Sequence, residues 1–490
     1  MSGTDQFMAS LASHITQTRD APTISAPVFT GLVRTLDVLL FLVAAAIADT
    51  WLGGVFETQL QGPLMLAAII GAGAGSMVLT SEGVYAIERL RRLRLQLWPI
   101  VKAGTLAGAA AIIGIFFVGA ETQAPRAFPF VFAFAALLLL AGSRVGLAML
   151  MTRWTLAGRF RRRIAVVAVS EFSREFIERL RAEPDDFEIA GVYDDRLRSG
   201  RVPGVHANVV VRGSVADLVR DSRAERIDVI AVALPLGAAQ RIADVLEQLS
   251  STVADVCLTA DLAGLAYHGH QFGAVGANPV IAIGENPMKD WSAAKKMCFD
   301  YAAGIIALVI LSPLLAVLAL AVKLDSRGPI LFRQPRLGFN NRMFVCYKFR
   351  TMYADMTDVM ADKQTTRDDP RITRVGRWMR KLSLDELPQL LNVLNGTMSL
   401  VGPRPHAPNT KAADRLFADV VQKYALRHRV KPGITGWAQV NGWRGETATV
   451  EQVENRVRCD LFYIDNWSVV FDLKIAVMTV LREIRSQNAF

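Results

Sequence analysis

The sequence predicts a membrane α-helical bundle, then an α/β Rossmann-like domain, then a compact α+β domain with a re-entrant membrane helix. Three observations support this fold class. Four long apolar stretches fill the first third of the chain, and strands alternate with helices in the middle. A fifth apolar stretch, flanked by lysines, precedes a segment rich in glycine and proline turns. The 490 residues are 52% hydrophobic and the mean hydropathy is +0.28, which is high for a soluble protein.

A four-helix transmembrane bundle is predicted over residues 29–155, after a polar N-terminal segment over 1–28. The apolar stretches, each long enough to cross a bilayer, lie at about 32–51, 61–80, 98–118 and 128–150. Arginines cluster between the second and third stretches and after the fourth, whereas the other two loops carry almost none. The positive-inside rule therefore places both ends of the bundle in the cytosol. The same alternation disfavours four buried helices of a soluble domain.

A Rossmann-like α/β domain is predicted over 160–285. Strands are expected at 164–169, 188–193 and 227–233, and helices at 171–180 and 237–249, an alternation typical of a parallel sheet. A dinucleotide site needs glycines after the first strand, but the chain has Ser170-Glu-Phe-Ser-Arg174 there. A scaffold or regulatory role is therefore favoured over a nucleotide site. His268 and His270 are more typical of loop residues than of metal ligands.

The fifth apolar stretch, over about 297–322, differs from the first four. Basic residues flank it on both sides: Lys295, Lys296, Lys323 and Arg327. Cations at both ends remove any preference for crossing. Ser312-Pro313 lies near its middle, where proline removes a helical hydrogen bond and bends the axis. A helix that enters and leaves by the same face satisfies both facts, whereas an ordinary kinked span would put the following domain outside.

The C-terminal domain, within 290–490, carries the excess positive charge. From Lys323 onward there are 27 Lys and Arg against 17 Asp and Glu, so this part alone accounts for the formal charge of +10. Nucleic acid, anionic lipid or a phosphorylated substrate could each explain this charge. No nucleic-acid-binding module is recognisable, and the membrane segments favour the other two. Amphipathic stretches around Trp378 and over 467–477 suit the membrane surface, although core packing explains them equally well.

Two adjacent carboxylates, Asp385 and Glu386, are the strongest candidates for chemistry. Neighbouring carboxylates repel each other, so keeping both ionised requires cations or a metal nearby. Basic segments with glycine-proline turns occur on either side of the pair: Lys348-Phe-Arg350, Gly402-Pro-Arg404-Pro405 and Lys431-Pro-Gly-Ile-Thr-Gly436. An aspartate nucleophile, a metal-binding glutamate and guanidinium groups suit attack on a diphosphate. Ser383 and Glu386 also have the spacing of a helix capping box, so a purely structural explanation stays open.

Four segments carry a specific resemblance: Tyr347-Lys-Phe-Arg-Thr-Met352, Ser383-Leu-Asp-Glu-Leu-Pro-Gln389, Ser399-Leu-Val-Gly-Pro-Arg-Pro405 and Lys431-Pro-Gly-Ile-Thr-Gly-Trp-Ala-Gln-Val-Asn441. In content and order they resemble the bacterial polyprenyl-phosphate sugar-1-phosphate transferases, the monotopic phosphoglycosyl transferases. The layout of the whole chain is similar to the large members of that family, the undecaprenyl-phosphate glucose phosphotransferases of exopolysaccharide assembly.

The resemblance implies transfer of hexose 1-phosphate, most simply glucose 1-phosphate, from a UDP-sugar to undecaprenyl phosphate, with UMP released. Asp385 would be the nucleophile that forms an aspartyl-phosphosugar intermediate, and Glu386 would bind Mg²⁺. Lys348, Arg380 and Arg404 would bind the substrate phosphates.

The resemblance also implies a re-entrant helix broken at Ser312-Pro313. The chain would be a multi-pass protein of the bacterial inner (cytoplasmic) membrane, in contact with membrane lipid, with its catalytic domain on the cytosolic face. The Rossmann-like domain is a candidate homodimer interface.

Several other residues are weaker candidates. Arg350, Gln439 and Asn441 are candidates for substrate contact, although a turn-forming role suits the last two equally well. His406 has no metal partner suggested by the sequence and is left unassigned. Four basic residues are each more typical of a surface ion pair than of a phosphate site: Arg350, Arg427, His428 and Lys431.

Three alternatives to this function stay open at the level of sequence. The same reaction with galactose 1-phosphate is one, because no residue identifies the sugar. A non-enzymatic membrane scaffold for polysaccharide assembly is another, and it would leave Asp385-Glu386 as a capping box. A membrane-bound nucleotide-sugar dehydratase is the weakest, because 163–285 has neither a glycine-rich NAD loop nor a Tyr-x-x-x-Lys pair.

Overall fold

A computed structural model describes the chain except for its uncertain segments. The described residues are 25–56, 63–117, 125–184, 186–235, 237–259, 273–275, 278–284, 288–356, 369–407, 411–412, 415–416, 424–443 and 449–485. Their contacts divide the chain into two compact units, Ala21–Arg161 and Arg162–Phe490. His268 and His270 lie outside the described residues.

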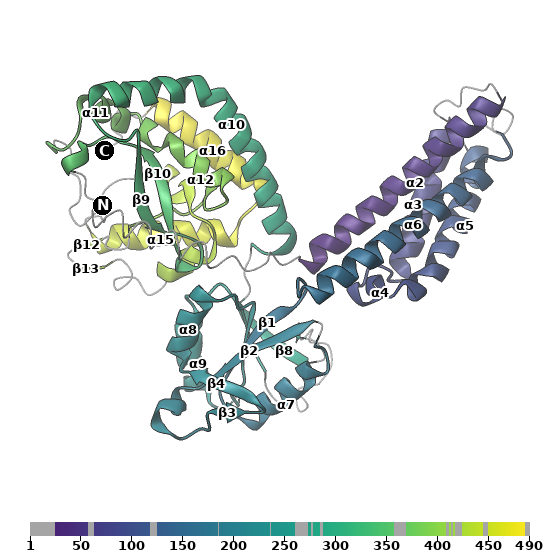
Figure 1. Cartoon of the computed structure of the whole chain (residues 1–490), viewed down its shortest axis with the longest axis horizontal. Helices are drawn as coiled ribbons and strands as arrows, with labels where there is room; N and C mark the ends of the chain where they lie inside the picture. Colours follow the sequence, from purple (N-terminus) through teal and green to yellow (C-terminus); the bar gives the residue numbers. More distant parts are fainter. Residues whose placement is uncertain are drawn as a thin grey trace. The chain divides into compact units, whose positions relative to one another are not determined.

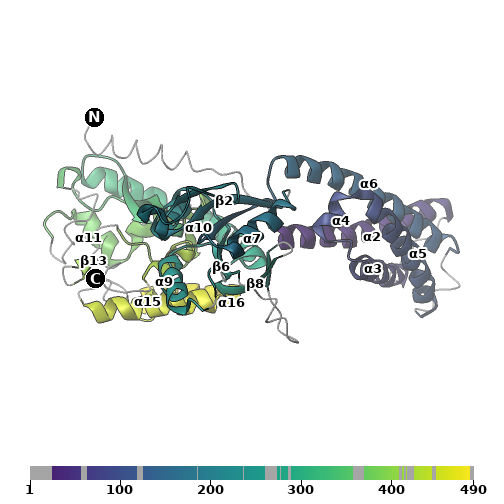
Figure 2. The same cartoon turned by 90° about the horizontal axis from the view of Figure 1, so that it is seen from below.

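Four long helices form the first unit and lie side by side in two perpendicular views (Figures 1 and 2). They are α2 (Ala26–Phe56), α3 (Pro63–Ser81), α5 (Leu93–Phe117) and α6 (Phe128–Leu156), with the short α4 (Ile87–Arg91) between α3 and α5. Each long helix is apolar and long enough to cross a membrane. Small residues let α3 and α5 approach closely: a side chain at Gly71 would lie 2.6 Å from the carbonyl oxygen of Ala107.

One ion pair is buried inside this bundle. The guanidinium of Arg144 on α6 contacts the carboxylate of Asp37 on α2, and both side chains have no exposed surface. The Tyr85 hydroxyl donates to the same carboxylate at 2.9 Å. Since an unpaired charge is costly inside a bilayer, this pair ties α2 to α6.

A mixed eight-stranded sheet forms the Rossmann-like domain. Its strand order is β3-β4-β2-β1-β5-β6-β8-β7. The five strands from β4 to β6 in this order pair with one another in parallel; the sequence predicted β1, β2 and β5 of these but not β4 or β6. The antiparallel edges are additions that the sequence analysis missed. The strands are β1 (Arg162–Val167), β2 (Phe187–Tyr193), β3 (Val205–His206), β4 (Val209–Gly213), β5 (Val229–Val232), β6 (Asp255–Leu258), β7 (Gly273–Val275) and β8 (Asn278–Gly284).

Helices cover both faces of this sheet (Figure 1). Alternate residues of β1 face opposite sides, as the pleat of a strand requires. Ala165 and Val167 belong to the core under α8 (Val215–Ala224) and α9 (Ala239–Leu249). Ile164 and Val166 belong to the core under α7 (Glu171–Arg181). The central strands are thus buried on both faces, which explains their near-continuous apolar sequence.

The last domain is built on a long helix, α10 (Asp290–Asp325), which is bent and arches over α12 (Leu390–Leu394) and α16 (Val469–Arg485) (Figure 1). Pro313 lies inside α10 and has no N–H to donate to the Val309 carbonyl. The Ser312 hydroxyl donates to that carbonyl instead, at 2.8 Å. The Ser-Pro pair therefore allows a bend without leaving the carbonyl unsatisfied.

Both ends of α10 pack on this same domain. Near its beginning, Lys296 contacts the buried Asp472 of α16 at 2.7 Å. Near its end, Leu318 and Val322 form a core cluster with Phe349 and Met379. Between these contacts, large apolar side chains are exposed, including Val309 and Ile310 at 67% and 69%.

The remaining elements form a small α+β fold under α10. A hairpin of β9 (Leu331–Leu337) and β10 (Met343–Phe349) packs against a 3₁₀ helix, η4 (Leu384–Gln389). Further regular elements are the 3₁₀ helices η2 (Phe339–Asn341), η3 (Ala354–Met356) and η5 (Tyr424–Arg429), the helices α11 (Arg374–Lys381), α14 (Trp437–Val440) and α15 (Val450–Asp465), and the strands β11 (Ser399–Val401), β12 (Lys411–Ala412), β13 (Arg415–Leu416) and β14 (Gly433–Thr435).

Candidate active site

Glu386 on η4 is the centre of a buried cluster of charges. Its Oε1 accepts hydrogen bonds from Lys348 Nζ at 2.7 Å and from Arg404 Nη2 at 2.6 Å. Its Oε2 accepts from Arg404 Nη1 at 3.0 Å. Lys348 comes from β10 and Arg404 from the loop after β11, so three segments that are distant in sequence converge on one carboxylate.

Asn392 explains why η4 lies beside the hairpin. This buried residue of α12 donates from Nδ2 to the Val345 carbonyl at 2.7 Å and accepts from the Tyr347 N–H at 2.9 Å. An amide that pairs with both backbone groups mimics a neighbouring strand and holds α12 against β10. The sequence analysis missed this residue; its only signal is a single asparagine inside the apolar run Leu390–Leu394.

Asp385 is 9% exposed, and none of the described residues donates a hydrogen bond to its carboxylate. Burial raises its pKa to about 6, and the neighbouring Glu386 acts in the same direction. Lys348, Arg380 and Arg404 limit the rise. At pH 7 this carboxylate is therefore mostly ionised, and its oxygens are available to attack a substrate.

Glu386 behaves in the opposite way. Burial acts to raise the pKa of its carboxyl group, but Arg404 and Lys348 outweigh burial and hold that pKa well below its usual range. Of these two adjacent carboxyl groups, Asp385 thus has a pKa above the usual value and Glu386 has a pKa below it. Such a separation is typical of active sites in which neighbouring acids have different roles.

The capping-box explanation does not describe this segment. Ser383 precedes η4 with a left-handed backbone (φ 55°), and its side chain makes no capping hydrogen bond to that helix. The Glu386 side chain contacts Lys348 and Arg404 instead. Arg380, at the end of α11, donates from Nε to the Thr351 hydroxyl at 2.8 Å.

Arg336 is a fourth cation near this site, and the sequence analysis did not single it out. It lies on β9 opposite Phe344, with its side chain on the same face of the hairpin as Lys348. Its Nη2 donates to Gln334 at 2.6 Å, and burial beside Arg404 lowers its pKa. Four cations therefore surround two carboxylates: Arg336, Lys348, Arg380 and Arg404. The excess of positive charge suits an anionic substrate.

Arg350, Gln439 and Asn441 contact backbone carbonyls of their own domain. Arg350 donates to the Ser326 carbonyl at 2.7 Å, just after the end of α10. Gln439 donates to the Ile434 carbonyl at 3.4 Å, and Asn441 donates to the Trp437 carbonyl at 2.7 Å. These contacts explain the three residues structurally, and a role in substrate binding stays a prediction.

The expectation of surface ion pairs is wrong for three of the four weaker candidates, the first of which, Arg350, is 3% exposed. Arg427 is 2% exposed and His428 is 5% exposed, because η5 is packed against α15. Lys431 is exposed, as expected. The sequence pattern Arg-His-Arg near a turn gave no signal that two of its members are buried.

The residues present fit a magnesium ion only when it is shared with substrate. Among the described residues, no group of three His, Cys, Asp or Glu side chains could form a metal site by itself. Magnesium commonly binds one or two protein carboxylates together with substrate phosphates. Glu386 Oε2 accepts one hydrogen bond and keeps a second lone pair, so it could take such a cation.

The backbone just after β1, where a dinucleotide-binding domain has its glycine-rich loop, has partners within the chain. After β1, the Asp194 carboxylate accepts the Val169 N–H at 2.8 Å, and Arg196 donates to the Val169 carbonyl at the same distance. The Ser170 hydroxyl caps α7. These contacts leave the Val169 backbone paired within the chain, and the segment has none of the glycines of a dinucleotide-binding loop.

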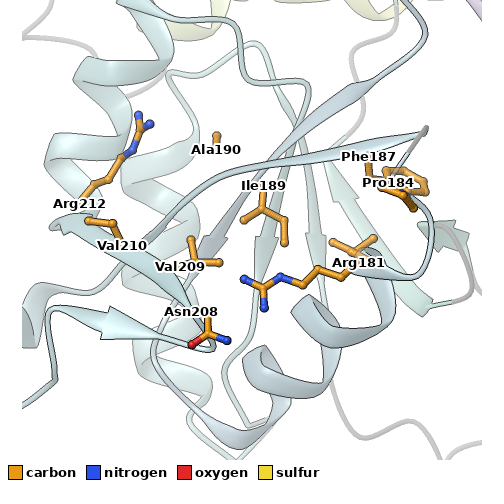
Figure 3. A pocket seen from close by; sticks show the side chains of 10 residues that line it. Arg181, Pro184, Phe187, Ile189, Ala190, Asn208, Val209, Val210 and Arg212 are labelled. Carbon is orange, nitrogen blue, oxygen red and sulfur yellow. The ribbon is translucent and has the colours of Figure 1, made fainter. Parts of the chain in front are cut away.

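A cleft of about 530 Å³ lies elsewhere in the same domain, between the end of α7 and strands β2 and β4 (Figure 3). Apolar side chains such as Ile189 and Val209 form much of its lining, and the Arg181 side chain extends into it (Figure 3). Arg212 also lines it but pairs with Glu225 at 3.2 Å.

The two predicted amphipathic segments combine core packing with exposure. Met379 on α11 is fully buried, whereas its neighbour Trp378 is 54% exposed. On α16, Asp472 and Ile475 are buried while Val470, Leu473 and Val477 are exposed. Each segment thus has one face in the core. The exposed face of α16 is largely apolar, whereas that of α11 combines Trp378 with Arg374 and Arg377.

Comparison with known proteins gives two family matches. The model of the bacterial sugar transferase family matches residues 291–486, and that of a CoA-binding domain matches 80–260. The undecaprenyl-phosphate glucose phosphotransferase of Komagataeibacter xylinus is 38% identical, over 95% of this chain and 86% of its own length.

Two UDP-glucose:undecaprenyl-phosphate glucose-1-phosphate transferases are also similar. The protein of Escherichia coli strain K12 is 38% identical over 68% of this chain and 70% of its own length. The protein of Klebsiella pneumoniae is 37% identical over 68% of this chain and 72% of its own length.

Proposed function

The chain belongs to the bacterial polyprenyl-phosphate sugar-1-phosphate transferases, and from this we propose that it transfers glucose 1-phosphate from UDP-glucose to undecaprenyl phosphate and releases UMP. The observation that carries the proposal is the buried Asp385-Glu386 pair with its surrounding cations. The relatives named above supply the substrates.

In the first step, an Asp385 oxygen attacks the phosphorus atom that carries the sugar. A new P–O bond forms to the carboxylate, and the P–O bond to UMP breaks. UMP leaves with the bridging oxygen and the electron pair, and a phosphosugar stays on Asp385. The lack of a hydrogen-bond donor to this carboxylate among the described residues, together with its raised pKa, supports its use as a nucleophile.

In the second step, a phosphate oxygen of undecaprenyl phosphate attacks the same phosphorus atom. The bond to Asp385 breaks, the carboxylate is restored, and undecaprenyl diphosphate glucose leaves. A covalent intermediate lets a water-soluble donor and a lipid acceptor use one site in turn.

Four cations offset the repulsion between the Asp385 carboxylate and the diphosphate. Arg404 is suited to two-pronged binding of a phosphate, as its contact with Glu386 illustrates, while Lys348 acts as a point charge. Arg380 and Arg336 add positive charge close to the carboxylates. Mg²⁺, held by Glu386 together with the substrate phosphates, would further lower the charge repulsion and stabilise the leaving group.

The contacts of α10 support a re-entrant rather than a spanning helix. A helix whose two ends both pack on one compact domain keeps that domain on one side of the membrane. The exposed apolar middle of α10 then enters the bilayer. With the positive-inside pattern of the bundle, this arrangement favours a catalytic domain on the cytosolic face of the inner membrane, where nucleotide sugars are made.

The first experiment measures UMP release from UDP-glucose by the full-length protein, with undecaprenyl phosphate and magnesium. We expect release by the wild type, none by Asp385→Asn, and near-normal release by Asp465→Asn, an exposed aspartate on α15. Glu386→Gln should weaken the dependence on magnesium. Without undecaprenyl phosphate, mass spectrometry should detect the phosphosugar on Asp385.

The outcomes separate the alternatives. Release with UDP-galactose but not UDP-glucose would keep the mechanism and change the sugar. Normal turnover by Asp385→Asn would remove the nucleophile assignment. If UMP is released from none of the UDP-sugars tested, the result would favour the non-enzymatic scaffold.

A further inference from the structure

A buried guanidinium holds the backbone of Arg404 in place. Arg427 Nη2 donates to the Arg404 carbonyl at 2.8 Å. The same nitrogen lies 2.7 Å from a carboxylate oxygen of Asp460 on α15. Asp460 and Arg427 are each 2% exposed, so neither charge is stabilised by bulk water.

Arg427 contacts the loop at a second point. Its Nη1 donates to His406 Nδ1 at 2.6 Å and to the Tyr424 hydroxyl at 3.2 Å. A guanidinium can only donate, so His406 must accept and is neutral. Burial, reinforced by Arg427, holds the pKa of His406 well below its usual range. One side chain thus binds the loop on both sides of Pro405.

The Arg404 side chain points the other way, to Glu386. From Asp460, the contacts therefore run through Arg427 to the Arg404 backbone, and from the Arg404 guanidinium to the site carboxylate. Burying a guanidinium and a carboxylate costs more than burying apolar side chains of similar size. An apolar pair at these positions would fill the core but could not fix the direction of a carbonyl.

We propose that Asp460 and Arg427 are positioning residues for the transferase reaction, and that they act through Arg404. The pair fixes the loop so that both nitrogens of the Arg404 guanidinium meet the site carboxylate and, with substrate bound, the diphosphate. This inference rests on the proposed function, because it assigns Arg404 to the phosphates. A misplacement of about 1 Å in such a group can cost about 10²-fold in rate.

A coupling experiment on the full-length protein in lipid nanodiscs tests this inference. UMP release from UDP-glucose is measured for Asp460→Asn, Arg404→Lys and the double variant. If Asp460 acts through Arg404, each single variant loses roughly 10²-fold in kcat/KM, and the double variant is little worse than either. A pair that only stabilises the fold gives losses that multiply, and that result overturns the inference.

Two further variants keep the experiment decisive. Asp228→Asn removes an ion-paired carboxylate next to β5 of the Rossmann-like domain. In a double variant with Arg404→Lys, the two losses of kcat/KM should simply multiply. If Asp460→Asn does not fold, Arg427→Lys replaces it, because a lysine keeps the charge but has one nitrogen for four partners. Wild-type activity in both Asp460→Asn and Arg427→Lys would also overturn the inference. A wild-type protein without activity would instead overturn the proposed function.

Discussion

Glu386 and Arg404 form a two-pronged ion pair, in which both guanidinium Nη atoms donate to the two carboxylate oxygens at 2.6 and 3.0 Å. The geometry requires the planar fork of arginine. The ion pair also fixes the orientation of the Arg404 guanidinium, which lies near the Asp385 carboxylate. The pair therefore prepares Arg404 for a phosphate before substrate arrives.

Replacement of Arg404 by lysine should lower kcat/KM for UDP-glucose by roughly 10²-fold, because a lysine keeps the charge but loses the second hydrogen bond. The measurement is the initial rate of UMP release against UDP-glucose concentration. Arg415→Lys provides a control for the same chemical change in another part of the chain. Equal activity of Arg404→Lys and wild type would show that the fork is not used.

The activity should depend on pH through Asp385. Its pKa is raised to about 6, so the reactive ionised form is lost as pH falls through 6. We expect kcat/KM for UDP-glucose to be level above about pH 7 and to fall about tenfold per pH unit well below 6. In a two-step reaction this parameter reports the first step, so titration of the lipid phosphate does not affect it.

Arg380→Gln tests whether Asp385 causes this pH dependence. Arg380 lowers the pKa of Asp385, so its removal should raise that pKa and shift the acid limb to higher pH. The residual activity of the variant is measured over the same pH range. An acid limb that does not move would assign the titration to another group.

The sequence predicted the charged residues of the site because their chemistry is local. Adjacent carboxylates repel, and the basic segments that offset this repulsion are visible as Lys348-Phe-Arg350 and Gly402-Pro-Arg404. Which cation meets which oxygen depends on the packing of β10 against η4, which no short pattern encodes. Asn392 and Arg336 were missed for that reason: Asn392 contacts the Val345 carbonyl and Arg336 the Pro405 carbonyl, both distant in sequence.

The fold was predicted best where one periodicity dominates. Continuous apolar runs identified the four bundle helices, and the buried strands identified the central parallel sheet. Strands β3, β4, β6, β7 and β8 were not predicted; β3 and β7 have only two and three residues, too few for a period to show. Burial of Arg427 was not predicted either, since a sequence shows a charge but not the carboxylate that neutralises it in the core.

Lys296 should be essential for anchoring the beginning of α10. Its ammonium lies 3.0 Å from Asp300 and 2.7 Å from Asp472, all largely buried. Lys296→Met would leave two buried carboxylates without their cation, so we expect a loss of about 3–5 kcal/mol in the free energy of unfolding. Thermal unfolding of the purified protein measures the change. The matched control is Lys295→Met, the exposed neighbour, and equal stability of the two variants would contradict the prediction.

Labelling from outside the cell should not reach the catalytic domain if α10 is re-entrant. The probe is Glu451→Cys, an exposed position on α15, in a chain whose four cysteines are replaced by serine. A membrane-impermeant maleimide should label this cysteine only after the membrane is opened. The control is Gln59→Cys, between the first two apolar stretches of the sequence, where the positive-inside rule places the chain outside, and it should react in intact cells.

Pro313→Ala extends the same labelling test to the bend of α10. Alanine restores the N–H that proline lacks, so it favours a straight helix that could cross the bilayer. We expect a fraction of Glu451→Cys to become accessible from outside and UMP release to fall in proportion. Labelling of Glu451→Cys in intact cells without the Pro313 substitution would show that α10 spans the membrane, and would contradict the re-entrant arrangement.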